Sequence, residues 1–301
     1  MLLCIGEILA DMIGEEKNGI TTYERKAGGA PFNVACALKK FGREVGFVGS
    51  VGDDLIGQFL IQYARDFGMD TTHIHLDRER NTTLAFVELN EEGDRSFCFY
   101  RKGTADYHLP AISDELLQQT DIVCIGSLMM SDSNCVEYAL DIAKRAHAYG
   151  KLVAFDVNYR TDIFRDTESA IATYKRILAV ADIVKFSEDE VAIFTEAYVE
   201  SLTEKLVLIT LGKEGSAWRY KGRENKLPTI TVKPVDTTGA GDAFFAGALS
   251  VLDGHVGQPF SEEIFDAMLK FGNVAGALNT TGRGAIDHLP DLQTIYTYIN
   301  K

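Results

Sequence analysis

Short apolar runs alternate with amphipathic segments along the chain, and this alternation limits the fold more than any other feature of the sequence. The apolar runs, such as Leu2–Ile8 and residues 206–212, are of strand length and carry few polar residues, as is typical of strands buried on both faces. A segment between such runs, 31–42, has Pro31 near a helix start and Gly42 at a helix end. Strands that alternate with helices predict an α/β fold with a mostly parallel sheet between two layers of helices.

One region interrupts this alternation. Residues 82–101 hold two β-rich runs around the turn sequence NEEGD, which predicts an antiparallel hairpin. Residues 12–27 also lack a helical pattern. We therefore expect a single domain over residues 1–301, with a small β lid built from about 12–27 and 82–103. The alternative is an edge extension that only protects the main sheet.

Composition narrows the possible partners and the compartment. The chain has 301 residues and a formal net charge of -14, and the charge argues against nucleic acid, whose binding needs a basic patch. No apolar run approaches the roughly 18 residues of a membrane span. The start of the chain lacks a basic segment, so we expect no signal peptide and a cytoplasmic protein. The five cysteines include no CxxC pair, so we expect buried thiols rather than a metal site or disulfides.

The stretch VDTTGAGDAFFAGAL, residues 235–249, places a glycine loop and an acid before an apolar helix. Backbone amides at a helix start attract anions, and Gly239 and Gly241 allow a ligand to approach closely. Neither a Walker A loop nor a dinucleotide GxGxxG after the first strand is present. Asp242 suits a proton acceptor for a hydroxyl that attacks phosphorus. By itself it also fits an acid that merely stabilises the helix dipole.

A second glycine pair stands near the other end of the chain, in KAGGAPFNVA, residues 26–35. Asn33 falls in the first turn of the helix that follows, where its amide could hydrogen-bond sugar hydroxyls. Taken alone, the stretch is equally typical of a plain turn and helix cap.

Together the two stretches resemble the signatures of the PfkB, or ribokinase-like, family of sugar kinases. The first corresponds to Gly28–Gly57 and the second to Asp236–Leu249, and the resemblance extends over essentially the whole chain. It implies a ribokinase-like three-layer α/β/α sandwich with a small β lid. It also implies that Asp242 is the catalytic base, that Gly239, Ala240 and Gly241 form an anion hole, and that Asp11, Gly28, Gly29 and Asn33 bind the sugar.

The resemblance further implies a nucleotide site and two metal sites. ATP is expected along Ser187, Thr210, Gly212, Lys213, Gly215, Gly241 and Asn273. The family's Asn-x-x-Glu motif, on which Mg²⁺ depends, reads SEDE here, so Ser187 replaces the asparagine while Glu190 keeps the acid, which would act on the metal through water. A potassium site is a further hypothesis, with ligands from the stretches that hold Asp236, Thr238, Asn279, Gly282 and Gly284.

The middle of the chain resembles the fructokinase branch of the family. The segment 82–109 follows the fructokinase pattern, and DVNYR resembles a DPNxR motif that fructokinases share with 2-keto-3-deoxygluconate kinases. Arg101 and Arg160 are therefore candidate contacts to substrate or phosphoryl group. We expect an ATP-dependent fructokinase that acts on the 6-hydroxyl of D-fructose. The alternatives are a 2-keto-3-deoxygluconate kinase and a non-catalytic sugar-binding regulator. A homodimer formed through the lid is also expected.

Overall fold

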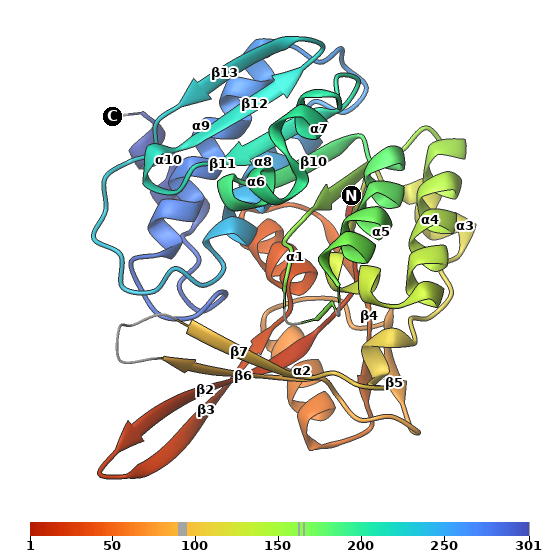
Figure 1. The fold of residues 1–301 in the computed structure, drawn as a ribbon, viewed down its shortest axis with the longest axis vertical. Coiled ribbons are helices and arrows are strands. Elements are labelled where there is room, and N and C mark those ends of the chain that lie inside the picture. Colours follow the sequence, from red (N-terminus) through yellow and green to blue (C-terminus); the bar gives the residue numbers. More distant parts are fainter. Residues whose placement is uncertain (90–94, 162, 165, 301) are drawn as a thin grey trace.

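The computed structural model describes residues 1–89, 95–161, 163–164 and 166–300. A nine-stranded sheet forms its centre (Figure 1). Neighbouring strands pair in parallel, except that β12 and β13 are antiparallel. In spatial order the strands are β13 (Arg223–Leu227), β12 (Ser216–Tyr220), β11 (Leu206–Thr210), β10 (Ile183–Ser187), β9 (Leu152–Asp156), β8 (Ile122–Ile125), β1 (Leu2–Ile5), β4 (Val45–Gly52) and β5 (Ile74–Asp77).

Helices cover both faces of this sheet, as the alternation of apolar runs predicts. Because successive side chains of a strand point to opposite faces, Leu2 and Cys4 of β1 join one apolar core while Leu3 and Ile5 join the other. On the first face lie α1 (Ala30–Lys40), α2 (Leu55–Asp66), α8 (Ala240–Asp253), α9 (Glu262–Asn279) and α10 (Leu292–Ile299). On the second lie α3 (Asp114–Gln119), α4 (Ser133–Ala148), α5 (Thr167–Val180), α6 (Glu188–Phe194) and α7 (Glu196–Glu200). The three-layer α/β/α prediction is confirmed.

A smaller, four-stranded sheet stands beside the main body (Figure 1). It contains the antiparallel hairpins of β2 (Leu9–Lys17) with β3 (Ile20–Gly28) and of β6 (Leu84–Leu89) with β7 (Arg95–Tyr100), joined by parallel pairing of β2 with β6. Both expected segments thus contribute strands, although β2 begins at Leu9 rather than near residue 12. The turn of the second hairpin, residues 90–94, lies outside the described residues.

The small sheet has an inner and an outer face. Phe99 packs with Leu9 and Leu128 against the main body. On the other face Phe86 makes edge contacts with Tyr23 and Tyr100, at 5.0 and 5.2 Å between ring centroids. Tyr100 remains 62% exposed, so this face presents aromatic side chains to solvent.

Four of the five cysteines are buried free thiols, as expected, whereas Cys98 on β7 is exposed. The expectation of burial is wrong at Cys98 because its strand belongs to the small sheet, where Cys98 pairs with Phe86 on the face that is exposed at Tyr100. No helix in the described part of the chain is both long enough and apolar enough to cross a membrane.

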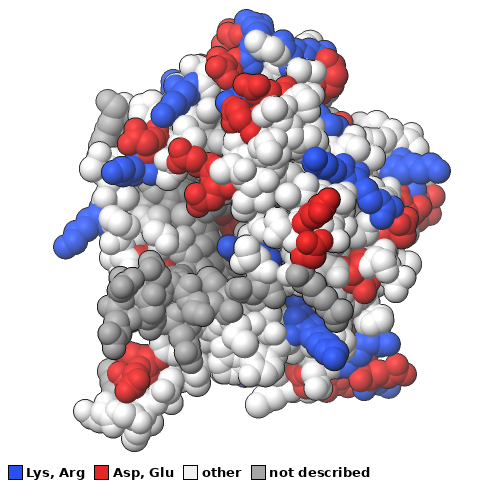
Figure 2. Space-filling model, in the orientation of Figure 1, with Lys and Arg blue, Asp and Glu red and all other residues white. Residues whose placement is uncertain are grey.

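The described residues also form three short 3₁₀ turns: η1 (Ala105–Tyr107), η2 (Ser127–Ser131) and η3 (Gly212–Glu214). On the face that Figure 2 shows, basic and acidic side chains are interspersed.

We expect Gly272→Ala to destabilise the protein by about 1–3 kcal/mol, because helices α8 and α9 touch through their backbones there. A Cβ at position 272 would lie 2.8 Å from the carbonyl oxygen of Phe244. Thermal unfolding measures the change, and Lys270→Ala, at an exposed position of the same helix, is the control. A Gly272→Ala variant as stable as the control would contradict this account of the packing.

Candidate active site

Two helix starts meet beyond the carboxyl ends of the parallel strands, where open α/β sheets bind their ligands. Asn33, in the first turn of α1, donates a hydrogen bond of 2.8 Å from Nδ2 to Oδ2 of Asp242, in the first turn of α8. The structure therefore joins the two glycine-rich stretches, 209 residues apart in the chain, in one site.

The glycine loop before α8 has the geometry that the sequence suggests. Gly239 adopts φ 73° at the N-cap, and a Cβ there would lie 2.6 Å from the Cβ of Ala285, so a larger residue is excluded. The amides of a first helical turn have no acceptor within the helix and carry the positive end of its dipole. At α8 this turn contains Ala240 and Gly241, so the start of the helix can bind an anion beside Asp242.

A buried lysine lies next to this loop. Lys185, near the end of β10, is 5% exposed and places Nζ 2.8 and 2.9 Å from the two carboxylate oxygens of Asp156. A Cβ at position 241 would lie 3.3 Å from this ammonium. Burial lowers the pKa of Lys185, but the carboxylates of Asp156 and Glu190 raise it by more. The lysine therefore supplies a lasting positive charge beside the helix start.

Asp242 has the character of a general base. Burial raises its pKa above the ordinary value for aspartate, while the hydrogen bond from Asn33 and the charges of Lys185 and Arg160 act in the opposite sense. A carboxylate of raised pKa is a stronger proton acceptor. The site thus combines a base, an anion-binding helix start and a buried cation.

The predicted sugar-binding residues lie around the same corner. Asp11 is half-buried on β2, and its carboxylate occupies the space that a Cβ on Gly28 would need. Gly29 adopts φ 107°, and a Cβ there would be 2.5 Å from the carbonyl oxygen of Glu7. Both glycines are therefore required by the close approach of backbone and side chain, and they leave the Asp11 carboxylate beside the start of α1.

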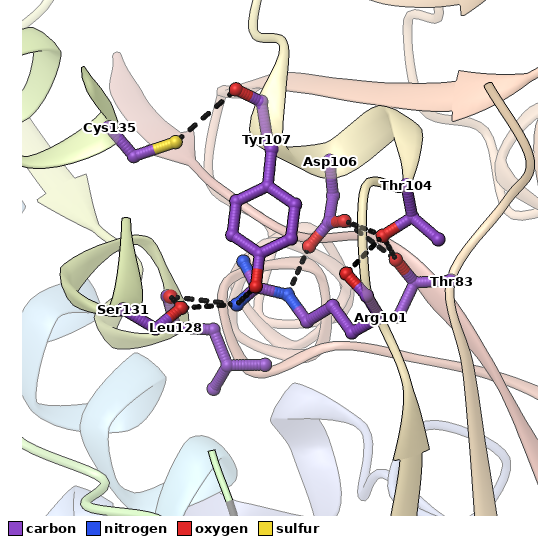
Figure 3. Close-up of polar contacts among 8 residues, drawn as sticks. All are labelled: Thr83, Arg101, Thr104, Asp106, Tyr107, Leu128, Ser131 and Cys135. Carbon is purple, nitrogen blue, oxygen red and sulfur yellow. Dashed lines mark hydrogen bonds and ion pairs between the residues drawn. The ribbon is translucent and has the colours of Figure 1, made fainter. Parts of the chain in front are cut away.

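Arg101 has a different environment from the one expected of a substrate contact. It is 4% exposed, and Figure 3 shows it bound within the protein. Its Nε donates to Asp106 at 2.5 Å, and its Nη1 lies 2.6 Å from the Ser131 hydroxyl and 3.0 Å from the Leu128 carbonyl. The guanidinium also stacks on the Tyr107 ring at 4.1 Å. Most of its donors thus serve the base of the small sheet, and Nη2 alone has no partner among the described residues.

Arg160 follows β9 and is exposed. Its charge lowers the pKa of Asp242, so it lies close enough to act on the site electrostatically. A contact from Arg160 to substrate or phosphoryl group stays a prediction.

Ser187 and Glu190 form a capping box at the start of α6. Glu190 accepts 2.7 Å from the backbone amide of Ser187 and 2.6 Å from that of Tyr159, and it is 7% exposed. Among the described residues no group of three or more His, Cys, Asp or Glu side chains gathers to hold a metal. A single carboxylate fits Mg²⁺ only as an outer ligand, since this ion keeps several waters and binds substrate phosphates.

The expected nucleotide residues lie at the end of β11 and beyond it. Thr210 ends the strand, Gly212 and Lys213 are exposed in η3, and Gly215 adopts φ 97°. Asn273 on α9 is bound within the protein: it accepts 2.8 Å from the Ser216 hydroxyl and donates to the carbonyls of Leu227 and Pro228 at 3.2 and 3.3 Å. Its side chain therefore holds the end of β13, and its contact with a nucleotide stays a prediction.

The loop expected to hold potassium is closed by Asp236. This carboxylate accepts 2.7 Å from the Thr238 amide and 3.0 Å from the Gly284 amide. The Asn279 amide donates to the Thr238 carbonyl at 3.1 Å, and Gly282 leaves room for the ring of His288. The Asn279 Oδ1 and the Thr238 Oγ1 are buried without hydrogen-bond partners in the described part of the chain. Orphaned oxygens of this kind fit a monovalent cation.

Sequence reasoning missed two charged residues, Lys185 and Glu7. Each is a charged side chain within an otherwise apolar run, DIVKFS or LLCIGEI. Charged side chains are seldom fully buried unless paired, so a charge inside a predicted buried strand was the available signal.

An anion-binding helix start beside a buried carboxylate, on a three-layer α/β/α sandwich, is the arrangement expected of a carbohydrate kinase. Comparison with known proteins agrees. Residues 1–292 match the model of the pfkB family carbohydrate kinases. The chain is 35% identical over 307 residues to probable fructokinase-5 of Arabidopsis thaliana, covering 96% of this chain and 94% of the relative.

Solved structures give the same result. The fructokinase of Xylella fastidiosa with bound ATP superposes with a TM-score of 0.93 at 30% identity, covering 99% of this chain and 98% of that one. A fructokinase double mutant of Vibrio cholerae with fructose, ADP and potassium ion bound gives 0.88 at 29% identity, covering 99% and 97%. The chain belongs to the pfkB family of carbohydrate kinases and is a phosphotransferase.

We expect Lys185→Met to shift the acid limb of the kcat/KM pH profile to higher pH. The lysine charge lowers the pKa of Asp242, so its removal lets that pKa rise, and the base is then protonated at a higher pH. We also expect kcat to fall by at least about tenfold, because a charge that stabilises the transition state is lost.

The measurement is a pH series of initial rates, with Lys144→Met, an exposed lysine of α4, as the control. An acid limb that stays in place in Lys185→Met would show that this lysine does not act on the base.

Proposed function

We propose that this kinase is an ATP-dependent fructokinase that transfers the γ-phosphoryl group of ATP to the 6-hydroxyl of D-fructose. The observation that carries the proposal is the 2.8 Å contact between Asn33 and Asp242, because it brings the sugar-binding and phosphoryl-binding signatures together. The relatives named above as fructokinases support fructose as the acceptor.

The proposed reaction uses the residues in the following way. Asp242 accepts the proton of the attacking hydroxyl, and its raised pKa suits this role. The amides of Gly239, Ala240 and Gly241 face the transferred group and stabilise its charge. The buried ammonium of Lys185 adds a fixed positive charge next to Gly241, which a chain of net charge -14 must supply locally.

The charge balance around Arg101 favours a neutral sugar over a keto-acid. A carboxylate substrate needs an uncompensated cation, but Arg101 is paired with Asp106 at 2.5 Å and has the Glu7 carboxyl nearby. In this proposal Asp11, Gly28, Gly29 and Asn33 bind the sugar hydroxyls. Arg160, which is exposed, contacts the phosphoryl group in this proposal.

The nucleotide and metals occupy the other side of the site in this proposal. ATP lies along the ends of β10 and β11, with Ser187, Thr210, Gly212, Lys213, Gly215 and Asn273 around it. Mg²⁺, held by the ATP phosphates and through water by Glu190, would neutralise phosphate charge. Potassium, held in the loop of Asp236, Thr238, Asn279, Gly282 and Gly284, would add positive charge behind the anion hole.

The small sheet acts as a lid in this proposal. Its inner face, with Phe99, would exclude water from the phosphoryl group. Its exposed aromatic face, with Tyr23, Phe86 and Tyr100, would pack on the lid of a second copy to form a homodimer. The cytoplasm is the expected compartment.

We expect Asp242→Asn to lower kcat at least about 100-fold, because the general base is lost. Coupled ADP-release assays over a sugar panel measure this and also identify the acceptor, and Asp253→Asn, at the other end of α8, is the control. A higher kcat/KM on 2-keto-3-deoxygluconate than on fructose would replace fructokinase by the keto-acid kinase. Sugar binding by calorimetry with no ADP formed at saturating Mg·ATP would instead favour a non-catalytic regulator.

Replacing K⁺ by a large organic cation should lower the activity, because the orphaned oxygens of Thr238 and Asn279 then lack their cation. Rates measured at constant ionic strength test this. Equal activity in the two salts would remove the potassium site from the proposal.

A further inference from the structure

Glu7 is a buried acid to which the proposed reaction assigns no role. It follows β1 at the carboxyl end of the central sheet and is 1% exposed. Neither carboxyl oxygen has a hydrogen-bond partner among the described residues. Gly126 leaves space for it, since a Cβ there would lie 2.9 Å from Oε2 of Glu7. A buried carboxyl without partners is costly to keep, so its presence needs an explanation.

Arg101 is the cation that acts on the charge of this acid. The two side chains act on each other: Arg101 lowers the pKa of Glu7, and Glu7 raises the pKa of Arg101. Yet the Nη2 of Arg101 and both oxygens of Glu7 are without partners in the described structure. Gly126, which lies against Glu7, and Leu128, to which Arg101 donates, are two residues apart at η2. The unused donor and the two unused acceptors, all buried, therefore lie in the same part of the interior.

Further polar groups border this space. The Ser50 hydroxyl is also buried without a partner among the described residues. The Glu7 charge also acts on the Tyr174 hydroxyl of α5: burial and then the Glu190 and Glu7 charges raise the pKa of Tyr174, while a hydrogen bond with Ser127 lowers it. A buried water needs two to four polar partners, and groups of this kind commonly hold one.

The position of Arg101 matters for the whole small sheet. Asp106, its ion-pair partner, also accepts 2.6 Å from Thr83 and 2.8 Å from Thr104 (Figure 3). Thr83 immediately precedes β6, and Thr104 follows β7. Through Asp106, Arg101 therefore binds the two open ends of the β6–β7 hairpin, and through Leu128 and Ser131 it connects them to η2.

We propose that Glu7 is a positioning residue for sugar binding. Through a buried water it binds Nη2 of the Arg101 guanidinium, and it thereby fixes the base of the small sheet where that sheet covers the sugar. The inference rests on the proposed function, since it assigns the small sheet to the sugar. It predicts an effect on the KM for sugar rather than on kcat, because no reacting group is touched.

The protonation state of Glu7 gives a second test, because a residue that only stabilised the fold would not make the KM for sugar depend on pH. Burial raises its pKa to about 8, against the charge of Arg101 and with smaller contributions from Asp106 and Asp242. Below that pH the neutral carboxyl can both donate and accept. Above it the carboxylate accepts from the bridging water and attracts the guanidinium more strongly, so we expect the KM for sugar to fall.

Two variants test the proposal. Glu7→Gln keeps a group that accepts from the bridging water, so its KM for sugar at pH 7 should stay within about twofold of wild type and should not change between pH 7 and pH 9. Glu7→Leu keeps the volume without the polar group, so its KM should rise at least about tenfold while kcat stays within about threefold. Glu115→Gln, at an exposed position of α3, is the control.

A wild-type KM that is flat from pH 7 to pH 9, or a Glu7→Leu variant with wild-type KM, would overturn the proposal. If Glu7→Leu does not fold, the comparison of wild type with Glu7→Gln decides. A crystal structure tests the water without any assay, because density within hydrogen-bond distance of both Glu7 and Arg101 Nη2 is expected, and an empty gap would contradict it. A wild-type enzyme that phosphorylates no sugar, in contrast, would refute the proposed function while leaving this structural test in place.

Discussion

The hydrogen bond between Asn33 and Asp242 depends on α1 and α8 starting at one point beyond the strand ends, and the rest of the site follows from that constraint. Gly29 and Gly239, the two N-caps, hold positive φ angles of 107° and 73°. Neither position tolerates a Cβ, because Gly29 packs against the carbonyl of Glu7 and Gly239 against Ala285. These contacts fix the two helix starts, and a side-chain amide of one helix orients the carboxylate of the other. The base thereby stands next to the amides of its own helix start.

Charge compensation is the second organising feature. The chain has a net charge of -14, yet its site must attract phosphates. Two buried cations lie near it, and each is held by an aspartate: Lys185 by Asp156 and Arg101 by Asp106. The two pairs serve different purposes, since Lys185 faces the helix start while Arg101 secures the small sheet. A buried cation without a partner would be costly, so pairing keeps the charge where the fold requires it.

Much of this architecture could be predicted from local patterns. The strands buried on both faces, the helix that begins near Pro31 and the hairpin around residues 90–94 all leave signals a few residues long. Two features did not. The antiparallel strands β12 and β13 are five residues each, and β13 is largely polar. Leu128 and Ser131, which accept from Arg101, and the partners of Asn273 come from segments distant in the chain, so no spacing rule indicates that these side chains bind the protein itself.

The sequence by itself determined the layered fold and the family, because apolar periodicity and two long glycine signatures are properties of contiguous residues. Only the tertiary structure decided what surrounds each charge. The pairing of Lys185 with Asp156, the raised pKa of Asp242 and the unpartnered carboxyl of Glu7 arise where separate strands end side by side. Burial and Coulomb interactions depend on distances through space, and those distances are set by the packing of the whole chain.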